Sequence, residues 1–70
     1  MKLTQTFGRN VRRERLAKGM TLEALANDVG LSYSYVGEIE RGRRNPTLAV
    51  VERISKVLGA APVTLLTPND

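Results

Sequence analysis

Glycine and proline residues divide this chain into short segments, and this division limits the possible folds more than any other feature. They stand at Gly19, Gly30, Gly42, Pro46, Gly59, Pro62 and Pro68. No segment between them alternates apolar and polar residues in the way a half-buried strand does. The segments instead repeat apolar residues at helical spacing. The sequence therefore predicts an all-α fold of five short helices.

Capping residues set the bounds of these helices. The predicted helices span about 4–18, 22–29, 33–41 and 48–58, and a short fifth helix begins near 62 and ends before 68. Thr21, Ser32 and Thr47 stand where a hydroxyl oxygen accepts a hydrogen bond from the first helical turn. Gly30 suits the left-handed residue that ends a helix. The turn between the second and third helices is then only about three residues long, so the two helices cross steeply.

Apolar stripes along these helices identify the candidate core. The predicted stripes are Leu3, Phe7 and Val11 in the first helix, Leu22, Leu25, Ala26 and Val29 in the second, Val36 and Ile39 in the third, and Leu48, Val51, Ile54 and Leu58 in the fourth. The spacings within each set, mostly three or four residues, place its members on one helix face. Arg15 continues the first stripe and Glu40 lies beside the third, so charged groups are expected at the edge of the core.

The composition excludes several functional classes. The 70 residues contain no cysteine and no histidine, so disulfides, thiolate metal sites and a histidine base are ruled out. No nucleophile–base arrangement is seen, and we expect no enzyme activity, no metal and no cofactor. The chain lacks a run of roughly 18 apolar residues for a membrane span, and it lacks the apolar segment of a secretory signal. We therefore expect a single domain over 1–70 in the cytoplasm.

Arginine dominates the positive charge. The chain has 11 Lys and Arg against 7 Asp and Glu, with a net charge of +4. Most of the cations are arginines in two clusters, which are Arg9, Arg12, Arg13 and Arg15, and then Arg41, Arg43 and Arg44. The planar guanidinium bonds two phosphate oxygens at once, so clustered arginine suits a nucleic acid. A solvated basic face that aids solubility is the alternative.

Residues 22–41 have the pattern of a helix-turn-helix. Ala26 is small enough for close approach of the second helix of the pair, about 33–41, and Gly30 supplies the positive φ of the turn. Val36 and Ile39 hold the next helix on the core. Its other positions are mostly polar, so that helix has little else to bury. Such a pair of helices is a common DNA-binding unit.

The segment GMTLEALANDVGLSYSYVGEIERGRRNPTL, residues 19–48, resembles the central motif of the phage-repressor-like family, which includes the lambda repressor, Cro and Xre-type regulators. The resemblance covers about 3–66. It implies a compact five-helix DNA-binding domain in which the third helix, about 33–41, enters the major groove and the second lies across the DNA backbone. Short standalone members of this type include restriction–modification controller proteins and Cro-like repressors. One departure is Leu22, where the family usually has a phosphate-binding glutamine.

The resemblance and a projection of the third helix at 100° per residue assign the DNA contacts. The projection points Val36, Ile39 and Glu40 inward, and Ser34, Gly37, Glu38 and Arg41 outward. The predicted DNA-binding residues are Thr21, Ser32, Tyr33, Ser34, Tyr35, Gly37, Glu38, Arg41, Arg43, Arg44 and Asn45. Ser32, Tyr33, Ser34 and Glu38 are the candidates for reading bases, and the loop after the helix is the candidate for phosphates.

Some of these residues have a structural alternative. The tyrosines would equally cover the edge of the core. Gly37 suits either close approach to DNA or tight packing against a neighbouring side chain, at a cost of roughly 1 kcal/mol in helix propensity. Arg15 and Glu40 occupy inward positions where a lone charge is costly. We therefore expect them to form a structural salt bridge, as the family resemblance also implies.

Assembly into a homodimer is expected, because one recognition helix reads few base pairs and proteins of this type bind pseudo-palindromes as dimers. The predicted dimer interface is Val50, Val57, Val63, Leu65 and Leu66, although some of these residues must close the core of the monomer.

The predicted function is that of a sequence-specific regulator of transcription, an activator or a repressor, that binds double-stranded operator DNA. RNA polymerase is a further candidate partner, and no membrane is involved. The alternative is an antitoxin or another protein-interaction module in which DNA binding is secondary.

Overall fold

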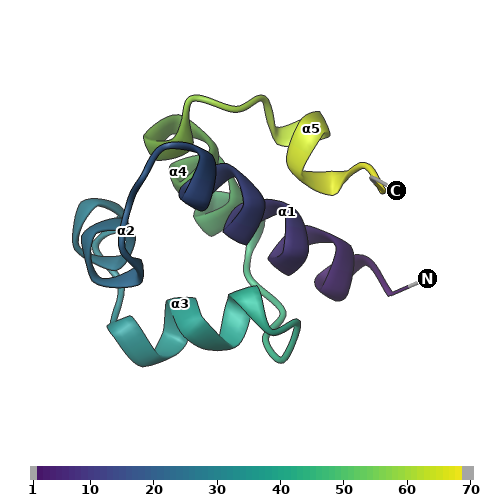
Figure 1. Cartoon of the computed structure of the whole chain (residues 1–70). Helices are drawn as coiled ribbons and strands as arrows, with labels where there is room; N and C mark the ends of the chain where they lie inside the picture. The colour runs from purple at the N-terminus through teal and green to yellow at the C-terminus, as the bar shows by residue number, and fades with distance from the viewer. Residues whose placement is uncertain (1, 69–70) are drawn as a thin grey trace.

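Five α-helices make up residues 2–68, the part of the chain that the computed structural model describes (Figure 1). They are α1 (Leu3–Ala17), α2 (Leu22–Val29), α3 (Tyr33–Glu40), α4 (Leu48–Leu58) and α5 (Pro62–Leu66). The predicted all-α fold is confirmed. The bounds of α2 and α4 are as predicted, α1 is shifted by one residue, and α3 ends one residue early because Arg41 is its C-cap.

Three side-chain caps and a left-handed glycine fix the helix-turn-helix locally. The hydroxyl oxygens of Thr21, Ser32 and Thr47 accept hydrogen bonds from backbone N–H groups three residues later, at 3.0–3.2 Å. Gly30 ends α2 with a φ of 79°, a conformation that other residues adopt at a cost. The predicted caps and turn are confirmed, and they position the start of α3.

The core is formed by one apolar face from each helix. Its buried residues are Phe7, Val11, Leu25, Ala26, Val29, Val36, Ile39, Val51, Ile54, Leu58 and Leu65. The predicted stripes are wrong at their ends, because Leu3 is 51% exposed and Leu48 is 82% exposed. Both residues lie in the first turn of a helix at the edge of the bundle. There the stripe runs past the helices that cover the rest of it.

Gly8 allows a close approach between helices, on the side of α1 that meets α3. A Cβ atom on Gly8 would lie 2.2 Å from the carbonyl oxygen of Ile39 and 2.8 Å from that of Glu40. Any side chain at this position would therefore push α3 away from α1. This role of Gly8 was not predicted, because a glycine in the middle of a helix does not indicate which element crosses it.

Two polar side chains tie further helices together. The Asn10 amide nitrogen, which is buried in α1, donates to the backbone oxygens of Leu65 at 2.9 Å and Thr67 at 2.8 Å. The Arg53 guanidinium donates to the backbone oxygen of Val29 and so ties α4 to the end of α2. These bonds satisfy carbonyl groups that helix ends leave unpaired. Neither tie was predicted from the sequence.

Neither a membrane-spanning helix nor a metal site is found within residues 2–68. No helix there is long and apolar enough to cross a membrane. The same residues contain no group of three or more acidic, cysteine or histidine side chains placed to hold a metal ion.

Candidate nucleic-acid interface

Helix α3 has one face in the core and the opposite face in solvent. Figure 1 shows it along the lower edge of the molecule, with α1 and α2 on one side only. Val36 and Ile39 are buried, with exposed fractions of 0% and 1%. The predicted inward direction of these residues is confirmed. They hold α3 in place while leaving its outer face free.

A buried ion pair joins the end of α3 to α1. The Arg15 Nε atom lies 2.7 Å from Glu40 Oε2, and Nη2 lies 3.0 Å from Oε1, so the pair is bidentate. Arg15 also donates to the backbone oxygen of Met20 at 2.9 Å. The hydrogen bond to Glu40 raises the pKa of Arg15, against an opposing effect of burial. The predicted pairing is confirmed, and its cation is of the kind that stays protonated in proteins.

The outer face of α3 is exposed and polar at its start. Tyr33 is 56% exposed, and Ser32 and Ser34 are also exposed. The Ser32 oxygen accepts the capping hydrogen bond, so its hydroxyl hydrogen is free to donate outward. The first turn of α3 therefore presents donors, acceptors and an aromatic ring to solvent.

Glu38 and two arginines form a charged group at the other end of this face. Glu38 Oε2 lies 2.8 Å from Arg41 Nη2 and 3.9 Å from Arg43 Nη1. The hydrogen bond from Arg41 lowers the pKa of Glu38, and the charges of Arg41, Arg43 and Arg44 act in the same direction. A carboxylate on an otherwise basic surface is thus kept ionised, as an acceptor of hydrogen bonds.

Gly37 lies on the inner side of α3, so its predicted outward direction is wrong. The residue is buried, and a Cβ atom there would lie 3.4 Å from both Leu22 Cδ2 and Arg41 Nη1. The projection considered α3 alone and therefore missed the start of α2, which covers this position. Packing against a neighbouring side chain, one of the two alternatives for Gly37, is what the structure contains.

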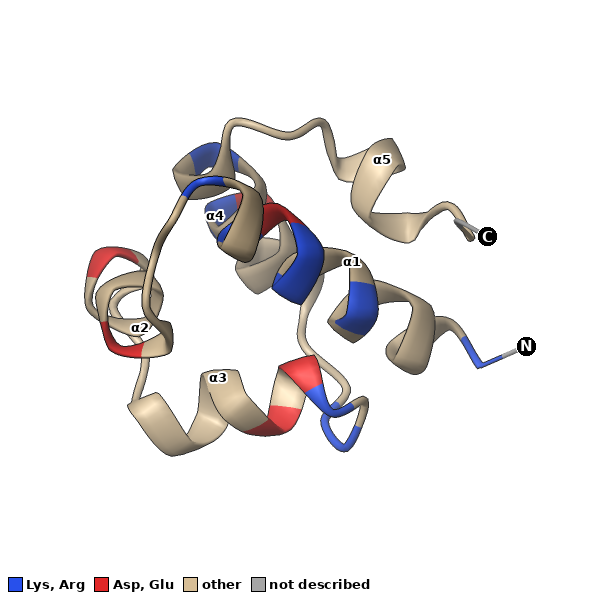
Figure 2. Ribbon diagram, in the orientation of Figure 1, with Lys and Arg blue, Asp and Glu red and all other residues tan. Residues whose placement is uncertain are grey.

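The loop from 41 to 47 continues the basic surface. Arg43, Arg44 and Asn45 are exposed, and Figure 2 shows this loop as a positively charged segment directly after α3. The Arg44 guanidinium lies 5.5 Å from the centre of the Tyr35 ring, within the range of a cation–π contact. Tyr35 also packs against the core. Tyr35 therefore both covers the edge of the core and orients Arg44.

The start of α2 lies beside α3. Thr21 is exposed, and its oxygen accepts the capping bond from the Ala24 N–H at 3.0 Å. Its hydroxyl hydrogen is free to donate to an outside group. Leu22 is half-buried and packs against the core, so this apolar residue lies at the edge of the core.

The predicted dimer interface needs correction. Leu65 is fully buried in the core of the monomer, so it is not available to a partner. Val50, Val57 and Leu66 are partly buried against the core, whereas Val63 is 68% exposed. A short helix such as α5 turns some of its apolar residues inward, and spacing alone does not show which.

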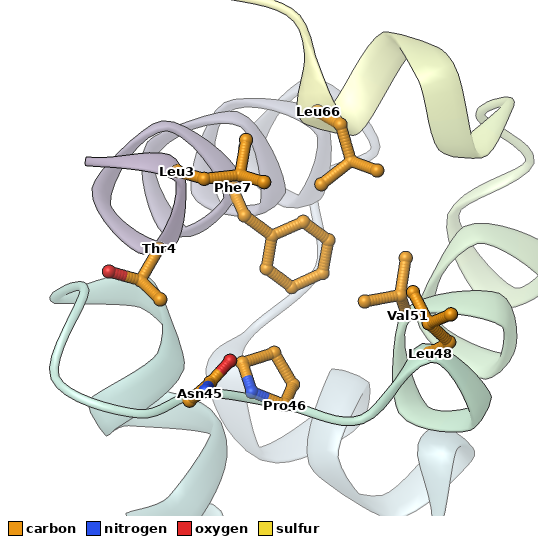
Figure 3. Close-up of a pocket in the computed structure, with 8 residues that line it drawn as sticks. All are labelled: Leu3, Thr4, Phe7, Asn45, Pro46, Leu48, Val51 and Leu66. Atoms are coloured by element: carbon orange, nitrogen blue, oxygen red, sulfur yellow. The ribbon is translucent and has the colours of Figure 1, made fainter. Parts of the chain in front are cut away.

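An apolar hollow lies elsewhere, between the first turns of α1 and α4 and the end of α5 (Figure 3). Its lining residues are Leu3, Thr4, Phe7, Asn45, Pro46, Leu48, Val51 and Leu66. The hollow has a volume of about 170 Å³, and the two exposed leucines stand on opposite sides of it. This surface was not predicted, because Leu3 and Leu48 were expected in the core.

Comparison with known proteins agrees with this geometry. A helix-turn-helix family model matches residues 11–65. The chain belongs to the helix-turn-helix family. It is 48% identical over 61 residues to the control protein C.BamHI of Bacillus amyloliquefaciens, which covers 86% of this chain and 75% of that protein.

Solved structures of controller proteins have the same fold as this helix-turn-helix chain. The restriction–modification controller protein C.AhdI from Aeromonas hydrophila is 40% identical, with a TM-score of 0.84 over 89% of this chain and 94% of its own. The controller protein C.Esp1396I, solved as a tetramer in complex with its natural 35 base-pair operator, is 35% identical, with a TM-score of 0.82 over 93% of this chain and 86% of its own.

Proposed function

We propose that this protein is a sequence-specific DNA-binding regulator of transcription that inserts α3 into the major groove of an operator. The observation that carries the proposal is the asymmetry of α3, which is fixed on its inner face and polar on its outer face. Beside it lies the loop from 41 to 47, which we call the arginine loop. The controller protein with the same fold and a bound operator supports the proposal. Such a regulator would act on DNA in the cytoplasm.

The two ends of the surface would have different tasks. Ser32, Tyr33, Ser34 and Glu38 would contact base edges, and the Glu38 carboxylate suits the amino group of a cytosine. Thr21, Arg41, Arg43, Arg44 and Asn45 would contact phosphates. Tyr35 would act through Arg44, whose side chain it supports. Phosphate contacts supply affinity and salt dependence, and base contacts supply sequence choice.

Selection from a random pool of double-stranded DNA tests the function. The purified protein should enrich one related set of sequences at low salt. The variant Ser34→Ala should change the preferred bases, because it alters the outer face of α3. The variant Lys56→Gln, on an exposed residue of α4, serves as the control and should select the same set as the native chain. Failure of the native protein to enrich any sequence would overturn the proposal.

We also propose that two copies bind the operator together, with the apolar hollow at their interface. Leu48 is the most exposed of the large apolar residues, at 82%, and a second copy would cover it in a contact that is the same on both subunits. Figure 3 shows Leu48 and Leu66 on neighbouring helices at this surface. Of the predicted interface residues in α5, Val63 and Leu66 keep surface that a second copy could contact.

Sedimentation across a concentration series tests this interface. Leu48→Glu should give a monomer where the native chain is a dimer. Leu16→Glu is the matched control, because Leu16 is 53% exposed and does not line the hollow. A native chain that stays monomeric at high micromolar concentration, or an equal effect of both variants, would contradict the proposed interface.

A further inference from the structure

The geometry points to a second phosphate-binding site on α1, formed by Gln5, Arg9 and Arg12 with Arg41, which holds a backbone phosphate of the DNA outside the helix-turn-helix. We call this surface the α1 notch. It rests on the proposed function, but it adds contacts from Gln5, Arg9 and Arg12, which lie outside α2, α3 and the loop after α3. Its ligand is a phosphodiester of the strand that borders the groove.

The α1 notch is a shallow hollow where α1 passes the end of α3. Gln5, Arg9, Arg12, Glu40 and Arg41 line it, and its volume is about 310 Å³. Arg9 and Arg12 are three residues apart, so their side chains lie on the same side of α1. Figure 2 shows positively charged segments on α1 and at the end of α3. The notch therefore gathers arginines from two helices around one space.

The arginines of the α1 notch have no structural partner within the protein. Among residues 2–68, Arg9 and Arg12 make no side-chain hydrogen bond or ion pair, and both are exposed. Arg13 differs, because it donates to Asn10 Oδ1 at 2.8 Å and lies 3.4 Å from Glu14. The neighbouring arginine thus has a task in the fold, whereas the two in the notch are free to bind an outside anion.

The acidic group in the α1 notch does not oppose an anion strongly. The Glu40 carboxylate takes two hydrogen bonds from Arg15, and its side chain is 6% exposed. Its negative charge is therefore compensated by the guanidinium of Arg15. Arg41 also pairs with Glu38 on the outer face of α3, so its guanidinium lies between the notch and that face. The notch and the proposed recognition surface are continuous.

This continuity favours a DNA backbone phosphate over a free anion. A strand held by the arginine loop carries further phosphates at regular spacing. In duplex DNA, successive phosphates of one strand are about 3.4 Å apart along the helix axis, so the second phosphate along lies roughly 7 Å away. Arg9 and Arg12 can engage such a group through paired N–H donors. This added phosphate contact would raise the salt dependence of binding without changing which bases are preferred.

The experiment measures the affinity for a selected operator against salt for two matched variants. Arg9→Gln with Arg12→Gln removes two charges from the α1 notch. Lys18→Gln with Lys56→Gln removes two charges from exposed residues outside it. Loss of one phosphate contact in the notch variant should lower the slope of log K against log salt by about 1 and weaken binding roughly eightfold at 0.1 M salt. The control should change the slope by well under one unit, and both should keep the native melting temperature.

Neutral methylphosphonate groups, placed singly along the operator, give a second measurement with the native protein. One or two positions next to the arginine-loop contacts should lose affinity for the native chain and lose nothing further for the notch variant. Equal effects of the two variants, or no position coupled to the notch, would overturn the inference. A native protein that selects no operator would overturn the proposed function itself, so the two failures are distinguishable.

Discussion

Two Arg–Glu pairs lie on opposite faces of α3, and they differ in almost every physical respect. The inner pair, Arg15 with Glu40, has side chains that are 10% and 6% exposed and joins two helices. The outer pair, Arg41 with Glu38, has side chains that are 55% and 28% exposed and lies within one stretch of chain. The two glutamates are only two residues apart, yet one faces the protein and the other faces solvent.

The difference shows how a small domain divides structure from recognition. Breaking a buried ion pair by removing one partner leaves an uncompensated charge in a place without water. An exposed pair is solvated already and contributes little to folding. The outer pair is therefore free to exchange its partners for DNA groups, while the inner pair keeps α3 at a fixed angle. The predictions below test this division.

The largest effect is expected at the inner pair. Glu40→Ala leaves Arg15 buried and unpaired, so we expect a loss of about 3 kcal/mol in the free energy of unfolding. Urea denaturation followed by circular dichroism measures it. Glu38→Ala is the matched control and should leave the midpoint almost unchanged. An unchanged midpoint for Glu40→Ala would show that the inner pair is not structural.

The next largest effect is expected where α1 crosses α3. Gly8→Ala places a methyl group 2.2 Å from the Ile39 carbonyl oxygen, a contact that only a backbone shift relieves. Overpacking of this kind costs about 2 kcal/mol, against a gain in helix propensity of roughly 1 kcal/mol. Thermal unfolding should show a clear net loss. A variant more stable than the native chain would mean that the helices separate at no cost.

Local features of this fold are predictable from the sequence. Thr21, Ser32 and Thr47 act through hydrogen bonds to residues three positions away, so short-range pattern is enough to find them. Gly30 is fixed by the turn that it makes. The Arg15–Glu40 pair spans two helices, but both residues occupy inward positions on their helices, and a charge in such a place requires a partner. The prediction therefore had a physical basis before any helix was positioned.

Features that depend on a neighbouring helix are not predictable in this way. Gly37 points outward on a projection of α3 alone, and α2 covers it. Leu48 continues an apolar stripe that no helix covers, whereas Leu65 does not look different from Leu66 in a helix of five residues. Gly8 and Asn10 act through groups far away in the sequence. In each case the missing information is the position of another helix, which spacing within one segment does not contain.

A smaller effect is expected at Gly37, where the inner and outer faces of α3 meet. A Cβ atom there would make ordinary contacts of 3.4 Å with Leu22 and Arg41. Gly37→Ala should therefore stabilise the free protein by up to about 1 kcal/mol through helix propensity, in contrast to Gly8→Ala. Thermal unfolding measures this. If the variant binds the selected operator as the native chain does, packing alone accounts for the glycine. Weaker binding would instead support close approach to DNA as the reason for Gly37.

The smallest effect on stability is expected at the outer pair, where pH is the sensitive variable. The pKa of Glu38 is lowered in the folded chain, chiefly by the hydrogen bond from Arg41. A lowered pKa gives a stabilising contribution above the unfolded value, about 4.3 for glutamate, and that contribution is lost as the pH falls through the folded value. Because the pair is exposed, the change in unfolding midpoint should be too small to measure.

Titration of the Glu38 carboxyl carbon by NMR detects the pair directly. The midpoint in the native chain should lie below the ordinary glutamate value and rise in Arg41→Gln, and 1 M salt should raise it as well because exposed charges are screened. Arg53→Gln is the control, since Arg53 binds the end of α2 and not Glu38. A native midpoint at the ordinary value would show that Arg41 does not hold Glu38 in solution. The outer face would then lack the fixed acceptor that the proposed contact with a cytosine requires.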